Sequence, residues 1–153
     1  MRGWAIGAVL VVCMLGLATL PSSGAMMGMD LVGSIKMQLK TAAFHAGELA
    51  QKGAIQATQL HLHHTINCIE GPSGPDFMQA AGYPCQNQGH GIIPDLRAAV
   101  MHMVPGSQAA LDDANIALKL ALQAQGMSDV SEAQPWAHVV ATYLMKASSD
   151  LGQ

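Results

Sequence analysis

Hydrophobic positions along the chain recur at helical spacing, and the alternating patterns typical of half-buried strands are nearly absent. Much of the sequence is Ala, Leu, Gln and Met, which favour helices, whereas aromatic residues and β-branched runs are few. The pattern therefore predicts an all-α protein.

Glycine and proline residues divide this pattern into helical segments. The first is predicted from Asp30, a suitable N-cap, to about Lys52, with one stripe formed by Leu31, Ala42, His45 and Leu49. Gly53 is a suitable C-terminal stop, and a second helix over residues 54–69 would fold back on the first. The alternative is one long helix through Gly53, because a single glycine costs only about 1 kcal/mol there.

The second half of the pattern begins with a segment rich in Gly and Pro, residues 71–94, which is too long for a simple turn. A third helical region starts at Pro94, must kink or stop at Pro105, and continues to about Gln125. A fourth helix is predicted from near Ser131. These segments predict a four-helix bundle with a long loop between helices two and three.

The N-terminal segment has the form of a secretory signal peptide. Arg2 precedes an apolar run over residues 4–20, and the small residues Ser23 and Ala25 follow. We expect cleavage after Ala25, which leaves residues 26–153 as a single helical-bundle domain in the periplasm or secreted. An uncleaved membrane anchor is the alternative. No second apolar stretch is long enough to span a bilayer, so we expect no membrane association after cleavage.

Two cysteines would remain after cleavage, because Cys13 lies in the apolar run. In an oxidising compartment Cys68 and Cys85 are expected to form a disulfide that ties the long loop to the end of helix two. Closing about 17 residues would contribute about 3 kcal/mol. The alternative is a pair of thiolate metal ligands.

Composition and missing motifs exclude several classes of protein. Only 11% of residues are charged, the net charge is −3, and no basic patch suggests a nucleic-acid partner. The chain has no CxxCH motif for covalent haem and no Glu-x-x-His pair for a di-iron bundle. It also lacks GxSxG, Walker and dinucleotide-binding motifs, and we do not expect an enzyme.

Three of the seven histidines occur in the stretch HLHH, residues 61–64. On a helix, His61 and His64 lie one turn apart on the same face as Cys68, whereas His63 points elsewhere. Two histidines one turn apart can chelate a transition metal, although such pairs also occur without metal.

A tight site needs further ligands, and the sequence offers several. His45 is the best candidate if helices one and two are antiparallel neighbours, and His102 and His138 lie among apolar residues of later helices. Weaker candidates are His63, His90, Met101 and Met103, the methionines being suitable for copper. The prediction is a copper or zinc ion bound by histidines. The alternatives are a bundle that binds haem b non-covalently, or a structural or interaction protein whose histidines are hydrogen-bonded core groups. The sequence leaves open whether the bundle closes in one chain or as a homodimer.

The block HLHHTINCIEGPSGPDF, followed by YPCQNQGHGIIPD, resembles a segment of exported bacterial proteins in which an HLHH-type helix end, an NC, a GP turn and a PC recur. That resemblance covers about residues 45–95 and implies no activity. More loosely, a small exported helical protein with histidines is similar to the periplasmic metal-binding proteins of nitrifying bacteria. This chain differs from those in its few histidines, its lack of repeated His heptads and its predicted disulfide.

Overall fold

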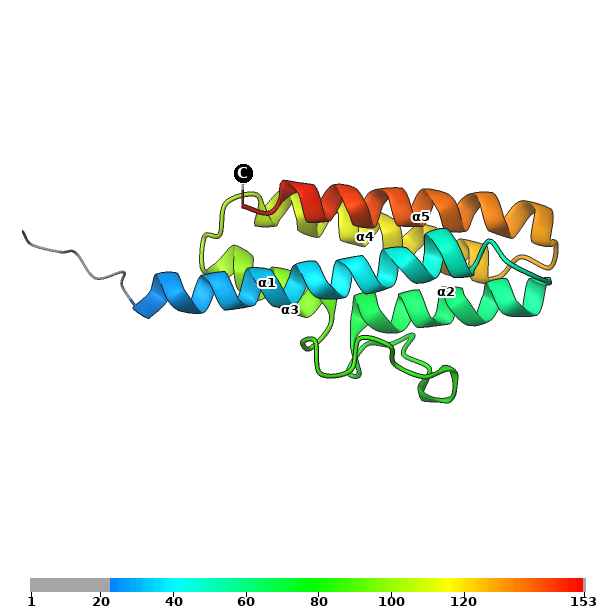
Figure 1. Ribbon diagram of the computed structural model, residues 1–153, viewed down its shortest axis with the longest axis horizontal. Coiled ribbons are helices and arrows are strands. Elements are labelled where there is room, and N and C mark those ends of the chain that lie inside the picture. The colour runs from blue at the N-terminus through cyan, green and yellow to red at the C-terminus, as the bar shows by residue number, and fades with distance from the viewer. Residues whose placement is uncertain (1–22, 153) are drawn as a thin grey trace, which may run out of the picture.

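The computed structural model describes residues 23–152, and side chains from Asp30 onward. Within this range the protein is all helical and contains no strand, which confirms the predicted class (Figure 1). The α-helices are α1 (Ser23–Phe44), α2 (Ile55–Glu70), α3 (Ile92–Met101), α4 (Ser107–Gln125) and α5 (Val130–Asp150). A π-helix, η1 (His45–Leu49), continues α1, and a short 3-10 helix, η2 (Gln79–Ala81), lies in the long loop.

The predicted signal peptide lies outside the described residues, except for its last three, which belong to α1. None of the helices in the described range is both long enough and apolar enough to cross a membrane.

The predicted count of four helices is not confirmed, because residues 23–152 form five α-helices. The prediction joined residues 94–125 into one kinked helix, whereas the chain reverses direction between α3 and α4 (Figure 1). Met103 (φ 53°) and Gly106 (φ 76°) take left-handed backbone conformations in this connection, which turns the chain instead of bending the helix. The helices α2 and α3 both pack against α1 and α4.

Helices one and two are separate, which settles the alternatives that the sequence left open. The helical run of α1 and η1 ends at Leu49, and Gly53 adopts a φ of 88° before α2 begins at Ile55. The Thr58 hydroxyl donates a hydrogen bond of 2.8 Å to the Ala50 carbonyl, one of the acceptors that the end of the helix leaves free. The two helices therefore run antiparallel, with the second half of α1 beside α2 (Figure 1).

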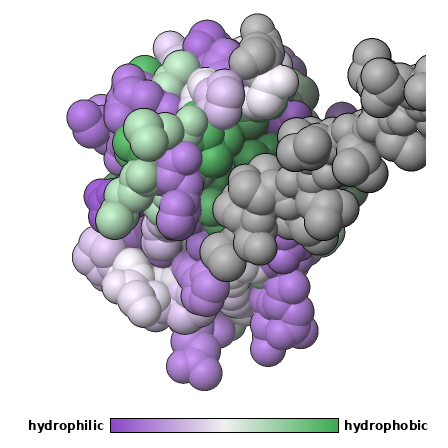
Figure 2. Space-filling model, turned by 90° about the vertical axis from the view of Figure 1, so that its left-hand side faces the viewer, coloured by the Kyte–Doolittle hydropathy of each residue, from purple (hydrophilic) through white to green (hydrophobic). Residues whose placement is uncertain are grey.

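The core consists mainly of small and aliphatic side chains. On α2 the side chains that face the core include Leu62, Ile66 and Ile69, which are all buried. The α4–α5 interface is lined by alanines, which let the two helices approach closely. At the end of the bundle where α1 begins, Figure 2 shows hydrophobic surface exposed between hydrophilic side chains.

The disulfide between Cys68 and Cys85 is present, as predicted. Both residues are fully buried, and the bond joins the last turn of α2 to the long loop. Its closed segment spans 17 residues.

We predict that the double variant Cys68→Ala/Cys85→Ala loses about 3 kcal/mol of unfolding free energy, because the unfolded chain gains the entropy of an open loop. Urea unfolding followed by circular dichroism measures the loss. Wild-type protein unfolded in a reducing agent should show the same midpoint as the variant, and an unchanged variant midpoint would contradict the expected role of the bond.

Candidate metal centre

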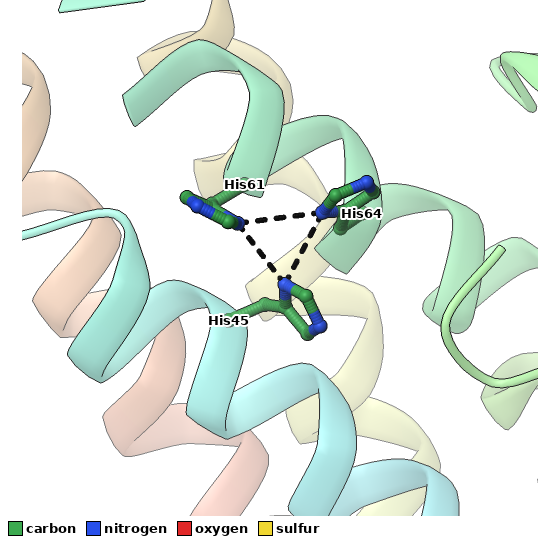
Figure 3. A group of neighbouring side chains, drawn as sticks. All are labelled: His45, His61 and His64. Atoms are coloured by element: carbon green, nitrogen blue, oxygen red, sulfur yellow. Dashed lines mark hydrogen bonds between the residues drawn. The ribbon is translucent and has the colours of Figure 1, made fainter. Parts of the chain in front are cut away.

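Three histidine side chains from two helices converge on one point between α1 and α2 (Figure 3). The Nδ1 atom of His45 lies 3.2 Å from Nδ1 of His61 and 3.2 Å from Nδ1 of His64. The Nδ1 atoms of His61 and His64 are 3.3 Å apart. All three side chains are half-buried, so the cluster is held by the fold but open to solvent on one side.

Helix geometry places the three rings. His61 and His64 lie one turn apart on α2, as the sequence predicted, and the antiparallel packing brings the end of α1 to them. His45 is the first residue of the π-helix, where the Ala50 N–H donates to the His45 carbonyl over 2.9 Å. Such a wider turn is rare and occurs frequently at functional sites.

The spacing of the three nitrogens matches the requirement of a tetrahedral metal. Zinc binds imidazole nitrogen at about 2.0–2.1 Å, so two ligands of a tetrahedral ion lie about 3.3 Å apart. The observed separations are 3.2, 3.2 and 3.3 Å. An ion about 2.05 Å from each nitrogen would lie slightly less than 1 Å above their plane, as the apex of a shallow pyramid. The three residues can therefore hold one metal ion without rearrangement of the helices.

The three Nδ1–Nδ1 contacts among the rings cannot all be hydrogen bonds. Each Nδ1 of a neutral imidazole is either a donor or an acceptor, so two of any three must be of the same kind. At least one of the three contacts then pairs two donors or two acceptors at hydrogen-bond distance. A cation removes the conflict, because it accepts a lone pair from every Nδ1 at once.

A backbone carbonyl fixes the protonation of one ring. Nε2 of His64 lies 2.6 Å from the carbonyl oxygen of Ala81 in η2. Because a carbonyl only accepts hydrogen bonds, Nε2 must hold the proton, and Nδ1 of neutral His64 is left with its lone pair. Metal-binding histidines usually donate their other N–H in this way, which orients the ring.

The loop that provides this carbonyl is held in place by Asn67, which is fully buried on α2. Its amide donates to the carbonyls of Met78 (2.8 Å) and Gly82 (2.7 Å), and its Oδ1 accepts from the Met78 N–H (2.8 Å). These bonds flank Ala81 on both sides. The next residue, Cys68, forms the disulfide to the same loop. The stretch from His61 to Cys68 thus provides two of the converging nitrogens and also anchors the loop that orients one of them.

Burial and mutual repulsion lower the pKa of two of these histidines, His45 and His61. Desolvation, together with the nearby His64 and His61, lowers the pKa of His45 to about 4. Desolvation and His64 also lower the pKa of His61. Metal ligands must be unprotonated, so the lowered pKa of His45 and His61 favours their lone pairs for metal binding.

The structure brings only part of the predicted ligand set together. Among the described residues, His45, His61 and His64 form the one group of three or more His, Cys, Asp or Glu side chains close enough to share an ion. His102 is exposed at the end of α3, and His138 is exposed on α5, where it lines a groove of about 560 Å³ between α1 and α5.

The weaker candidates also lie elsewhere. His63 is half-buried on α2 with its Nδ1 unpartnered, and His90 is exposed with its Nδ1 3.1 Å from the Asp95 carboxylate. Met101, the last residue of α3, is 82% exposed, and Met103, which follows the helix, is 87% exposed. Cys68 and Cys85 are joined to each other, so they do not serve as thiolate ligands in this state.

Sequence reasoning missed Asn67 and Ala81. The carbonyl of Ala81 has no side-chain signal at all, because any residue has the same backbone group. For Asn67, the one signal in the sequence is its position directly before Cys68, a cysteine of the predicted disulfide.

Comparisons with protein-family models, with curated proteins and with solved structures find no match for this chain. The case for a metal centre therefore depends on the geometry of its own residues.

We predict that the metal-free protein loses stability as the pH falls from about 6.5 to about 4. Unfolded His45 takes up a proton near its ordinary pKa of 6.5, whereas folded His45 does so only near 4. The stabilisation is thus complete above pH 6.5 and is lost as the pH falls towards the folded pKa. Urea unfolding across this range measures the slope.

His45→Ala should reduce this pH dependence without abolishing it, because it removes the residue whose pKa is about 4 while His61 keeps a lowered pKa. His138→Ala, a change at an exposed histidine outside the cluster, should keep the wild-type slope. Equal slopes in His45→Ala and wild type would contradict the assignment.

Proposed function

We propose that this protein binds one transition-metal ion, of the copper or zinc class, through the Nδ1 atoms of His45, His61 and His64. The observation that supports the proposal is the convergence of three ring nitrogens at the spacing of tetrahedral ligands. The hydrogen bond from His64 to the Ala81 carbonyl supports it independently, because it leaves the converging nitrogen as a lone-pair donor.

The donor set favours metals that accept imidazole nitrogen. Imidazole suits zinc, copper, iron and nickel, and geometry and supply decide among them. The three nitrogens have the spacing of one face of a tetrahedron, which is the usual geometry of zinc. Thioether ligands for copper(I) are less favoured, because Met101 is the last residue of α3 and Met103 follows it, and the C-terminal end of α3 lies away from α2 (Figure 1).

A haem is less favoured than a single ion. Axial haem ligands approach the iron from opposite sides of the porphyrin, whereas these three nitrogens are mutual neighbours and occupy one side of a coordination sphere. A purely structural role for the histidines is also less favoured, because their triangle leaves at least one unfavourable contact.

We further propose that the protein acts outside the cytoplasm, as a single exported domain. The buried Cys68–Cys85 disulfide supports this, because such bonds persist in oxidising compartments. The predicted signal peptide agrees with the same location. The function would then be to hold or pass on a metal ion in the periplasm or outside the cell, without an enzymatic reaction.

Metal affinity tests the proposal directly. Titration of metal-free protein with zinc, in competition with a chromophoric chelator, should give one site per chain. We expect His64→Ala to weaken binding by more than about 100-fold, because loss of an outer hydrogen-bond partner alone typically costs 10–100-fold. His138→Ala is the matched control and should bind as wild type does. Equal affinities for wild type and for the His61→Ala/His64→Ala double variant would rule out the site.

The loop anchor gives a second prediction. Asn67→Ala removes the three hydrogen bonds that flank Ala81, so His64 loses its orientation while every ligand remains. We expect zinc affinity to fall by about 10–100-fold. The control is Asn115→Ala on α4, whose amide bonds only to the Leu111 carbonyl one turn earlier. If both variants keep their helical circular dichroism and the same affinity, the loop has no role at the site.

A further inference from the structure

The His cluster provides three ligands and no fourth. Within the described residues, no other His, Cys, Asp or Glu side chain joins the group formed by His45, His61 and His64. A structural zinc site normally has four protein ligands, whereas a site with three keeps one position for water or another molecule. The cluster therefore has the composition of an open site.

We propose that a metal ion bound to these three histidines keeps one coordination position for an external ligand, namely a water molecule that a small monodentate anion displaces. This proposal rests on the proposed metal-binding function, and it specifies which kind of external ligand the bound metal ion takes. Its basis is the three-sided arrangement of the nitrogens and the absence of a fourth protein ligand among the described residues.

The geometry defines where the external ligand binds. The three Nδ1 atoms form a nearly equilateral triangle, with sides of 3.2, 3.2 and 3.3 Å. They occupy three vertices of a tetrahedron, and the fourth vertex lies on the axis through the centre of the triangle, on the side of the ion away from the nitrogens. One atom of a small ligand fits this vertex, so the site selects monodentate binding.

Charge favours an anion over a neutral ligand. Three neutral imidazoles contribute no negative charge, so a divalent ion keeps both of its positive charges. No Asp or Glu side chain of the described residues joins the ligand group. Glu70 instead accepts the Asp76 N–H over 2.8 Å, and the Asp95 carboxylate contacts His90 and Gln38. A small anion that replaces water would compensate part of the charge. In this exchange the anion forms one metal–ligand bond, water leaves, and no electron is transferred.

The surface around the cluster allows such a ligand to approach. All three histidines are half-buried and not sealed in the core. Phe44, whose ring lies 6.2 Å from that of His45, is 51% exposed, and Leu60 is 44% exposed beside His61. Phe44 and Leu60 are uncharged, and Glu48, the acidic residue of η1, does not belong to the ligand group.

Cobalt(II) is a suitable probe, because its visible spectrum reports the number and type of its ligands and it accepts the same nitrogen donors as zinc. One equivalent of cobalt(II) is added to the metal-free protein, and sodium azide is then titrated at constant ionic strength. We expect the tetrahedral cobalt bands to shift in wavelength and intensity with a saturable 1:1 dependence on azide. The His138→Ala variant should show the same shift.

The outcomes separate the two proposals. If cobalt binds at the three histidines but azide leaves the spectrum unchanged, the position is closed and this inference is wrong, while metal binding stands. The same conclusion follows if size-exclusion chromatography shows that cobalt joins two chains through a shared ion. If the His61→Ala/His64→Ala variant binds cobalt with the same spectrum as wild type, the three histidines are not the metal ligands. The proposed metal-binding function is then wrong, and so is the proposal of an open coordination position.

Discussion

The Nδ1 atoms of His45, His61 and His64 lie 3.2–3.3 Å from one another, and the structure of the site depends on this contact. Three such nitrogens cannot all satisfy one another, because each is either a donor or an acceptor. In the folded protein without a metal ion, at least one contact therefore pairs two donors or two acceptors. A bound cation removes this unfavourable contact. The antiparallel packing of α1 and α2, the π-turn at His45 and the one-turn spacing on α2 all maintain this contact.

The long loop has a role that its composition does not reveal. Its middle part is fixed to α2 by the Cys68–Cys85 bond and by the three hydrogen bonds of Asn67. Between Met78 and Gly82, the two residues that Asn67 binds, lies Ala81, whose carbonyl accepts a hydrogen bond from Nε2 of His64. The disulfide and the buried amide therefore do more than close a loop: they hold a backbone acceptor where it determines which nitrogen of His64 faces the cluster.

The sequence predicted the parts of the site that follow from helical periodicity. His61 and His64 share a face because they are one turn apart, and His45 reaches them because the chain turns back at Gly53 after the first helical run has ended at Leu49. His102 and His138 were chosen for their apolar neighbours, but α3 ends just before His102, and His138 is exposed on α5. The fifth helix was missed because the pattern cannot tell a kink at Pro105 from a full reversal, which depends on the backbone conformations of Met103 and Gly106. The Ala81 carbonyl was beyond prediction, since tertiary contacts alone place it.

A crystal structure of the protein loaded with one equivalent of zinc, with anomalous diffraction collected on both sides of the zinc absorption edge, tests the central claim most directly. The expected result is one anomalous peak about 2.0–2.1 Å from Nδ1 of His45, His61 and His64. The helices should keep their present arrangement, with the bond from His64 to Ala81 intact. A peak at another position, such as beside His90 and Asp95, with the three histidines left free of metal, would contradict it.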